Sequence, residues 1–159
     1  MPENNFTMVV LAGGASSRMG REKSDLFWGG RTFLETQIEK GRKLGARQIL
    51  ISGYRGTHCR EEIVPDRIPG QGPLGGLESC FRKAETEKCL VLGVDTPLVP
   101  LEELHRLLHY AMEETDKPVT MLCHNGKEES LMAVYDARLY KEITDFLESG
   151  RSSVYRFLN

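Results

Sequence analysis

The chain has 159 residues, of which 40% are hydrophobic, and this size fits one globular domain with a single sizeable core. A formal net charge of −2 excludes a general attraction to nucleic acid or to anionic membranes, so any anion binding must come from a local site. No segment approaches the roughly 20 apolar residues of a membrane span, and positions 1–5 carry no signal-peptide pattern. We therefore expect a soluble, cytoplasmic protein.

The first third of the chain predicts a β-α-β unit. The apolar run at 7–11 ends in Ala-Gly-Gly, which is typical of a buried parallel strand that leads into a loop. Amphipathic spacing predicts a helix over 32–44, with Gly45 as the residue that ends it. A second strand is expected at 48–52, and the connection between the two strands should be right-handed.

The rest of the chain continues the alternation of helices and strands. Positions 63–76 are rich in proline and glycine and are expected to form a loop. Asn125-Gly126 lies between two strand-like segments and suggests an antiparallel pair, although the polar residues after it leave the register open. The further expected elements are helices at 77–84, 101–114 and 139–147 and strands at 89–94, 119–123 and 131–135.

These elements predict a Rossmann-like, single-domain α/β fold, a three-layer α/β/α sandwich with a mainly parallel sheet and one antiparallel strand. No repeat or linker divides the chain, so residues 1–159 are expected to form one domain. The four cysteines are widely scattered and contain no C-x-x-C pair, which favours reduced and mostly buried thiols. They are Cys59, Cys80, Cys89 and Cys123.

Unusual residues gather at three expected strand ends, after Leu11, after Ser52 and at Asp95. In an open α/β sheet, ligands bind at the carboxyl ends of the strands. The first of these loops combines glycines, which let backbone N–H groups approach a ligand closely, with cations, and that combination favours a polyphosphate. The residues concerned are Gly13, Gly14, Gly20, Arg18 and Lys23.

Two commoner phosphate motifs do not fit. A Walker loop needs Gly-Lys-Ser/Thr in succession, whereas Gly20 is separated from Lys23 by Arg21-Glu22. Positions 70–75 match G-x-G-x-x-G, but they follow Pro69 rather than a strand, so we do not expect a dinucleotide site there.

Positions 11–23, Leu-Ala-Gly-Gly-Ala-Ser-Ser-Arg-Met-Gly-Arg-Glu-Lys, resemble the signature of the nucleotidyltransferases that include molybdenum cofactor guanylyltransferase. Two further segments follow in the family's order. Gly72-Pro73-Leu74-Gly75-Gly76 resembles its G-P-L-x-G segment, and Asp95-Thr96-Pro97 resembles its metal-binding D-x-P. The resemblance implies an enzyme with a nucleotide-binding half at about 6–100 and an acceptor half at about 101–159.

The resemblance also implies roles for individual residues. Lys23, Arg18 and Asp95 would act in catalysis, and Asp95 would hold Mg²⁺ as the cofactor. Where relatives often place an asparagine after the second strand to contact the base, this chain has Ser52-Gly53-Tyr54. The residues implied to bind the nucleotide are Leu11, Ala12, Gly13, Gly14, Lys23, Ser52, Asp66, Gly72, Pro73, Leu74 and Asp95.

Simpler explanations exist for some of these residues. Asp95 could cap the helix that follows it, and Asp66 could form a turn before Arg67. His105 and His109 are four positions apart on an expected helix, but no third metal ligand accompanies them, so a solvated or packed helix face is the favoured interpretation.

The leading functional hypothesis is transfer of GMP from GTP to molybdopterin with release of pyrophosphate. The resemblance favours guanylyl over cytidylyl transfer because positions 11–14 read Leu-Ala-Gly-Gly, where cytidylyl relatives typically read Leu-Ala-Ala-Gly. Cytidylyl or sugar-phosphate transfer on the same fold stays open. So does a non-catalytic nucleotide-binding or regulatory module, because the related chains commonly continue into an F-x-N-x-N-T-P segment beyond the point where this sequence ends at Asn159. No oligomeric state is predicted.

Overall fold

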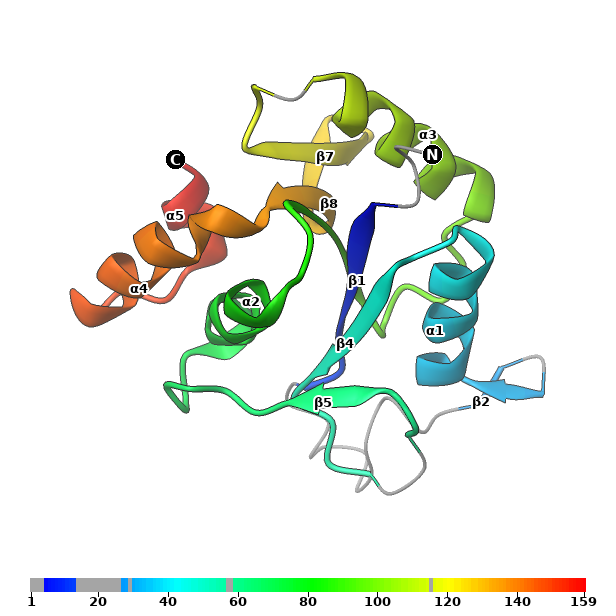
Figure 1. The fold of residues 1–159 in the computed structure, drawn as a ribbon, viewed down its shortest axis with the longest axis horizontal. Helices are drawn as coiled ribbons and strands as arrows, with labels where there is room; N and C mark the ends of the chain where they lie inside the picture. Colours follow the sequence, from blue (N-terminus) through cyan, green and yellow to red (C-terminus); the bar gives the residue numbers. More distant parts are fainter. Residues whose placement is uncertain (1–4, 14–26, 29, 57–58, 115) are drawn as a thin grey trace.

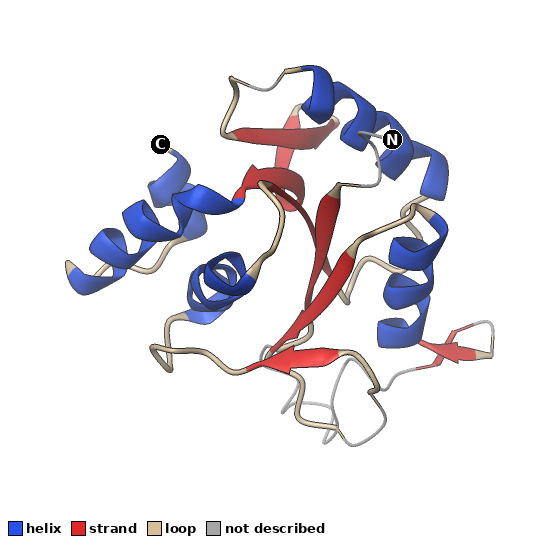
Figure 2. Ribbon diagram, viewed as in Figure 1, coloured by secondary structure: helices blue, strands red, loops and turns tan. Residues whose placement is uncertain are grey.

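The computed structural model describes residues 5–13, 27–28, 30–56, 59–114 and 116–159, with only the backbone described at 27–28. These residues form a mixed sheet of six strands in the order β5-β4-β1-β6-β8-β7, with helices on both faces (Figures 1 and 2). A separate two-stranded ribbon pairs β2 (Phe27–Trp28) with β3 (Arg31–Thr32). The predicted three-layer α/β fold is confirmed.

The centre of the sheet is parallel and its far edge is antiparallel. Strand β1 (Phe6–Leu11) lies between β4 (Gln48–Ser52) and β6 (Lys88–Gly93), and β5 (Glu62–Val64) pairs with β4, all in parallel. Strand β8 (Lys127–Asp136) runs antiparallel to both β6 and β7 (Val119–His124). One strand of the main sheet is therefore reversed, as the sequence predicts.

Strand β1 is buried on both faces because alternate side chains enter two different cores. Met8 and Val10 pack with α1 (Phe33–Lys43) and α3 (Leu101–Glu113), whereas Val9 packs on the opposite side. That second core contains α2 (Gly72–Lys83) and α4 (Tyr140–Glu148). A short 3-10 helix, η4 (Ala137–Leu139), precedes α4, and α5 (Val154–Leu158) follows it.

The boundaries of several elements follow from local chemistry. Thr32 caps α1, since its hydroxyl accepts the Glu35 N–H while the Glu35 carboxylate accepts the Thr32 N–H. Gly45 follows the end of α1 with a φ of 82°, which confirms its predicted role. Asn125 and Gly126 both have positive φ, at 52° and 77°, and form the predicted turn between β7 and β8.

One predicted boundary is wrong. Residues 72–76 were expected in a loop, but α2 begins at Gly72 and takes in all of them. Pro73 is tolerated in the first turn because its missing N–H would have no partner there. Within the helix, glycine suits position 76 because a Cβ there would lie 2.3 Å from Ser52 Oγ. The short elements β2, β3, β5 and α5 were not predicted.

All four cysteines are free thiols, as expected. Cys80 and Cys89 are buried, Cys59 is half-buried and Cys123 is exposed, so burial applies to fewer of them than predicted. Burial raises the pKa of Cys80 to about 12, which keeps this thiol protonated. Within the described ranges no helix is long and apolar enough to cross a bilayer.

The ends of β1 and β4 are joined by a close backbone contact. The carbonyl of Ser52 accepts hydrogen bonds from the N–H groups of Ala12, at 2.8 Å, and Gly13, at 3.1 Å. Gly53 has a φ of 72°, and a Cβ on it would lie 2.8 Å from Gly13 Cα. Gly53 is therefore required both for its conformation and for the space it leaves.

Gly53→Ala is expected to lower the free energy of unfolding by more than Gly150→Ala. Gly150 also has a positive φ, 86°, but a Cβ there meets nothing within 4 Å. Both variants should lose about 1 kcal/mol from the strained φ. Only Gly53→Ala should lose about 1–3 kcal/mol more from backbone overlap. Urea denaturation measures both values, and equal losses would contradict the proposed contact.

Candidate active site

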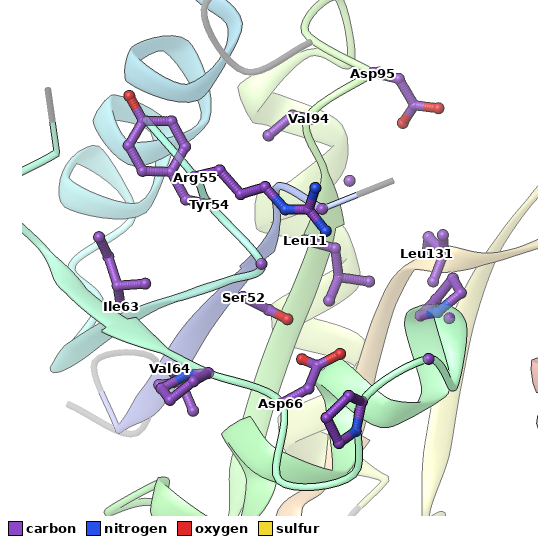
Figure 3. Close-up of a pocket in the computed structure, with 18 residues that line it drawn as sticks. Leu11, Ser52, Tyr54, Arg55, Ile63, Val64, Asp66, Val94, Asp95 and Leu131 are labelled. Atoms are coloured by element: carbon purple, nitrogen blue, oxygen red, sulfur yellow. The ribbon is translucent and has the colours of Figure 1, made fainter. Parts of the chain in front are cut away.

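A cavity of about 680 Å³ lies at the carboxyl ends of the four parallel strands (Figure 3). The last residues of β1, β4, β5 and β6 all contribute to its wall, so the three strand ends singled out in the sequence do meet. The lining comprises Leu11, Gly13, Ser52, Gly53, Tyr54, Arg55, Ile63, Val64, Pro65, Asp66, Pro69, Gly70, Gly72, Pro73, Gly93, Val94, Asp95 and Leu131.

Most of the described site candidates line this cavity. They are Leu11, Gly13, Ser52, Asp66, Gly72, Pro73 and Asp95. Two candidates do not: Ala12 is 2% exposed and Leu74 is fully buried, and both pack in the core. Gly14, Arg18 and Lys23 lie outside the described residues, as does Gly20. The roles assigned to all of these residues stay predictions.

The structure adds residues that the sequence did not single out. Arg55 follows β4, and in Figure 3 its guanidinium extends across the cavity from the wall opposite Asp66. Among the described residues that line the cavity, Arg55 is the only one with a basic side chain. Leu131 comes from β8, in the C-terminal part of the chain. The position of Arg55 in the loop directly after a predicted strand was the available signal.

Asp66 carries an unsatisfied carboxylate oxygen. Its Oδ1 is buried and has no hydrogen-bond partner within the described ranges, while the Ser52 hydroxyl points toward the carboxylate and hydrogen-bonds to it (Figure 3). Burial raises the pKa of Asp66, the nearby Glu78 raises it further, and Ser52 acts in the opposite direction. A buried oxygen without a partner requires an explanation, and a ligand at this cavity would supply one.

The backbone around Asp66 is anchored to α2 and α4. The N–H of Arg67 donates to Ser79 Oγ at 2.8 Å, and the Arg67 guanidinium forms two hydrogen bonds to Glu78, of 3.1 and 2.5 Å. Thr144 donates to the same carboxylate at 2.9 Å. Although burial opposes ionisation of Glu78, these hydrogen bonds hold its pKa below the ordinary value. Asp66 is thus positioned through its neighbour Arg67, which is paired with the ionised carboxylate of Glu78.

Asp95 has a different environment because it is exposed at the end of β6. A Cβ on Gly93 would lie 2.8 Å from Asp95 Oδ1, so glycine allows the carboxylate to lie over the strand end. The interpretation of Asp95 as a helix cap is wrong, since α3 begins at Leu101 with Pro100 as its N-cap residue. Its carboxylate is therefore available to a ligand in the cavity.

Helix α1 supports the loop that carries Asp95. The side-chain nitrogen of Gln37 donates to the carbonyls of Gly93, at 2.8 Å, and Thr96, at 3.0 Å. Lys40 Nζ donates to the carbonyl of Pro97 at 2.7 Å, and burial lowers the pKa of Lys40 to about 8. Gln37 is fully buried, which makes these bonds expensive to lose.

The described carboxylates could hold a divalent cation only together with other ligands. No group of three or more His, Cys, Asp or Glu side chains gathers within the described part of the chain. Mg²⁺ in nucleotide sites commonly takes one or two carboxylates and fills its other positions with phosphate oxygens and water. Asp66 and Asp95 both border the cavity and are the carboxylates that could hold such an ion. His105 and His109 lie exposed on α3, as the sequence indicated.

Comparison with known families decides the class of this site. The profile described as the MobA-like NTP transferase domain matches residues 8–159. The chain belongs to this family. The resemblance seen in the three sequence motifs is thereby confirmed, and the MobA-like domain is a nucleotidyltransferase.

Curated relatives carry the corresponding names. A protein of Carboxydothermus hydrogenoformans named "Probable molybdenum cofactor guanylyltransferase" is 33% identical over 154 residues, which cover 96% of this chain and 77% of the relative. The "Molybdenum cofactor guanylyltransferase" of Xanthomonas euvesicatoria is 41% identical over 104 residues, which cover 65% of this chain and 53% of the relative.

Solved structures share the fold of this MobA-like domain. Molybdopterin-guanine dinucleotide biosynthesis protein A of Archaeoglobus fulgidus superposes with a TM-score of 0.76 at 22% identity, over 96% of this chain and 78% of that one. The 2-C-methyl-D-erythritol 4-phosphate cytidylyltransferase of Thermus thermophilus gives 0.65 at 16% identity, over 91% and 78%. At these identities the likeness shows the fold.

Asp66→Asn is expected to stabilise the ligand-free protein at pH 7. The raised pKa means that ionised Asp66 destabilises the folded state. This destabilisation is fully present above the raised pKa and disappears as the pH falls toward the ordinary pKa of 3.8. The gain in free energy of unfolding should therefore shrink at acid pH. Urea denaturation across pH 3–7 measures it. Exposed Asp145→Asn is the control, and a gain independent of pH would contradict the assignment.

Gln37→Leu should disturb the Asp95 loop where Gln48→Leu does not. Gln37 donates to Gly93 and Thr96, whereas Gln48 accepts from Thr7 and Glu85, at the amino end of the sheet. Both variants should lose about 1–3 kcal/mol of unfolding free energy through unpaired groups. Only Gln37→Leu should shift the amide NMR resonances of residues 93–97. The same shifts in both variants would contradict a supporting role for Gln37.

Proposed function

We propose that this MobA-like domain transfers GMP from GTP to the phosphate of molybdopterin and releases pyrophosphate, with Mg²⁺ as cofactor. The observation that carries the proposal is the arrangement of Asp66 and Asp95, which border one cavity at the carboxyl ends of the parallel strands. The names of the curated relatives supply the acceptor and the base.

The nucleotide would occupy the cavity with its phosphates near the glycine-lined strand ends. Gly13 and Gly53 line the cavity with backbone and no side chain, and Arg55 provides positive charge beside them. We assign Lys23 and Arg18, together with Gly14, to the triphosphate on the basis of the family signature. These cations would offset the negative charge that grows on the leaving pyrophosphate.

The reaction is an in-line displacement at the α-phosphorus. An oxygen of the acceptor phosphate forms the new bond to this phosphorus while the bond to the bridging oxygen of the leaving pyrophosphate breaks. A phosphate monoester has a second pKa of about 6 and is already mostly ionised at pH 7, so no strong general base is required. Alignment and charge neutralisation therefore account for most of the rate enhancement.

Each carboxylate has a part in that alignment. Asp95 would hold Mg²⁺, and the bound ion supplies positive charge at the reacting phosphates. Gln37 and Lys40 fix the loop that carries Asp95, so its position does not depend on the ligand. Asp66 lies beside the nucleotide, anchored through Arg67 to Glu78. The protein thus presents its oxygens in place before the substrate binds.

A second candidate is cytidylyl transfer. The cytidylyltransferase of Thermus thermophilus shares the fold, and the chain departs from the asparagine that relatives often use for base contact after the second strand. Leu-Ala-Gly-Gly at 11–14 and the names of the relatives favour guanine.

Isothermal titration with GTP, CTP, ATP and UTP in the presence of Mg²⁺ tests the nucleotide, and we expect GTP to bind most tightly. With molybdopterin added, pyrophosphate release should fall on the order of 100-fold in Asp95→Asn and in Lys23→Ala, since each removes a group that stabilises the transition state. Asp145→Asn and Lys141→Ala, at exposed positions of α4, are the controls. Tighter binding of CTP than of GTP would contradict guanylyl transfer and favour cytidylyl transfer. Tight binding of GTP without release of pyrophosphate would favour a non-catalytic nucleotide-binding module.

A further inference from the structure

A second cavity, of about 770 Å³, lies beside the first and shares Asp95 with it. Its wall is formed by the loop after β6, by one residue each from α1 and α3, and by the β7–β8 hairpin. Phe33, Val99, Leu122 and Met132 give it a mainly apolar surface. Its volume lies in the range of sites for small organic molecules. Because it borders Asp95 from outside the nucleotide cavity, it is placed to hold the molecule that reacts there.

A bulge in β8 shapes this second cavity. Met121 of β7 pairs with Ala133, but the next residue, Leu122, pairs with Glu129, so residues 130–132 have no partner on β7. The hydroxyl of Tyr135 donates to the Ser130 carbonyl at 2.6 Å and fixes the bulge. Leu131 lines the first cavity while its neighbour Met132 lines the second one, because consecutive side chains of a strand point to opposite faces of the sheet. Bulges of this kind commonly redirect side chains next to active sites.

The charges of this wall select among possible occupants. Its described lining contains the acidic residues Asp95, Glu103 and Glu129 and no lysine or arginine. Glu103 lies 3.6 Å from Arg106, whereas the Glu129 carboxylate has no ion pair or hydrogen bond within the described ranges. A phosphate in this cavity would meet these carboxylates with no lysine or arginine in the described lining to offset them. An uncharged ring that offers N–H donors would complement both the apolar wall and Glu129.

We propose that this cavity, the acceptor cavity, binds the pterin ring of the acceptor, with Glu129 accepting hydrogen bonds from the ring N–H and the adjacent amino group. The inference rests on the proposed function, which supplies a phosphorylated pterin as acceptor. The ring then lies between the β7–β8 hairpin and the loop after β6, and its phosphate-bearing end extends to Asp95, where both cavities meet. Glu129 determines acceptor specificity and takes no part in the chemistry.

Fluorescence titration with pterin and with lumazine tests this inference on the full chain. The two rings have nearly the same shape, but lumazine carries an oxo group where pterin carries the amino group. The wild type should bind pterin at least tenfold more tightly than lumazine, since a carboxylate accepts from the amino group and repels an oxo group. Glu129→Gln should weaken pterin binding about tenfold or more and remove most of this preference. Glu128→Gln, at the exposed neighbouring position, should change neither value.

A second variant tests the cavity independently of the carboxylate. Leu122→Trp places a larger side chain in the wall and should abolish pterin binding while GTP still binds with wild-type affinity. Failure of the wild type to bind pterin, or equal losses in Glu128→Gln and Glu129→Gln, would overturn the acceptor cavity. GTP binding and pyrophosphate release would in that case still stand as separate evidence for the proposed function. If the wild type does not bind GTP, the proposed function itself is refuted.

Discussion

The site depends on the contact between the backbones of β1 and β4 at their carboxyl ends. Ser52 offers one carbonyl to two N–H groups of the Ala12-Gly13 segment, and Gly13 and Gly53 then meet without side chains between them. The contact forms part of the wall of the cavity at the strand ends, which Gly13, Ser52 and Gly53 line. It also places the Ser52 side chain against Gly76 of α2 and toward Asp66, so three loops are positioned by one close approach (Figure 3).

The two carboxylates of the cavity are supported from opposite faces of the sheet. Asp66 depends on α2 and α4, through Arg67 and the buried Glu78, whereas the Asp95 loop depends on α1, through Gln37 and Lys40. In the proposed mechanism each helix layer therefore holds one of the two carboxylates in place.

The parts of the fold that depend on local patterns could be predicted from the sequence. Buried strands ending in glycine, such as 48–52, were predicted closely because apolar runs and turn residues act over a few positions. The start of α2 could not be predicted, since Gly75 and Gly76 are poor helix formers whose presence is explained by tertiary neighbours such as Ser52. Leu74 belongs to the motif but faces the core for the same reason, because the helix has already begun. The bulge at 130–132 likewise depends on the pairing of β7 with β8. The sequence alone therefore left the register of this pair open.

In the proposed reaction two anions must react with each other, and the charges of the two cavities bear on how these anions approach. The described walls provide Asp66, Asp95 and Arg55 on one side and acidic groups without a lysine or arginine on the other. A triphosphate entering alone would meet two carboxylates, so it gains most from binding together with a cation that both the phosphates and Asp95 can share. The acceptor phosphate gains in the same way only at Asp95, because the rest of its cavity repels it. The charge distribution thereby favours one orientation of the acceptor, with its phosphate at the point where the two cavities meet.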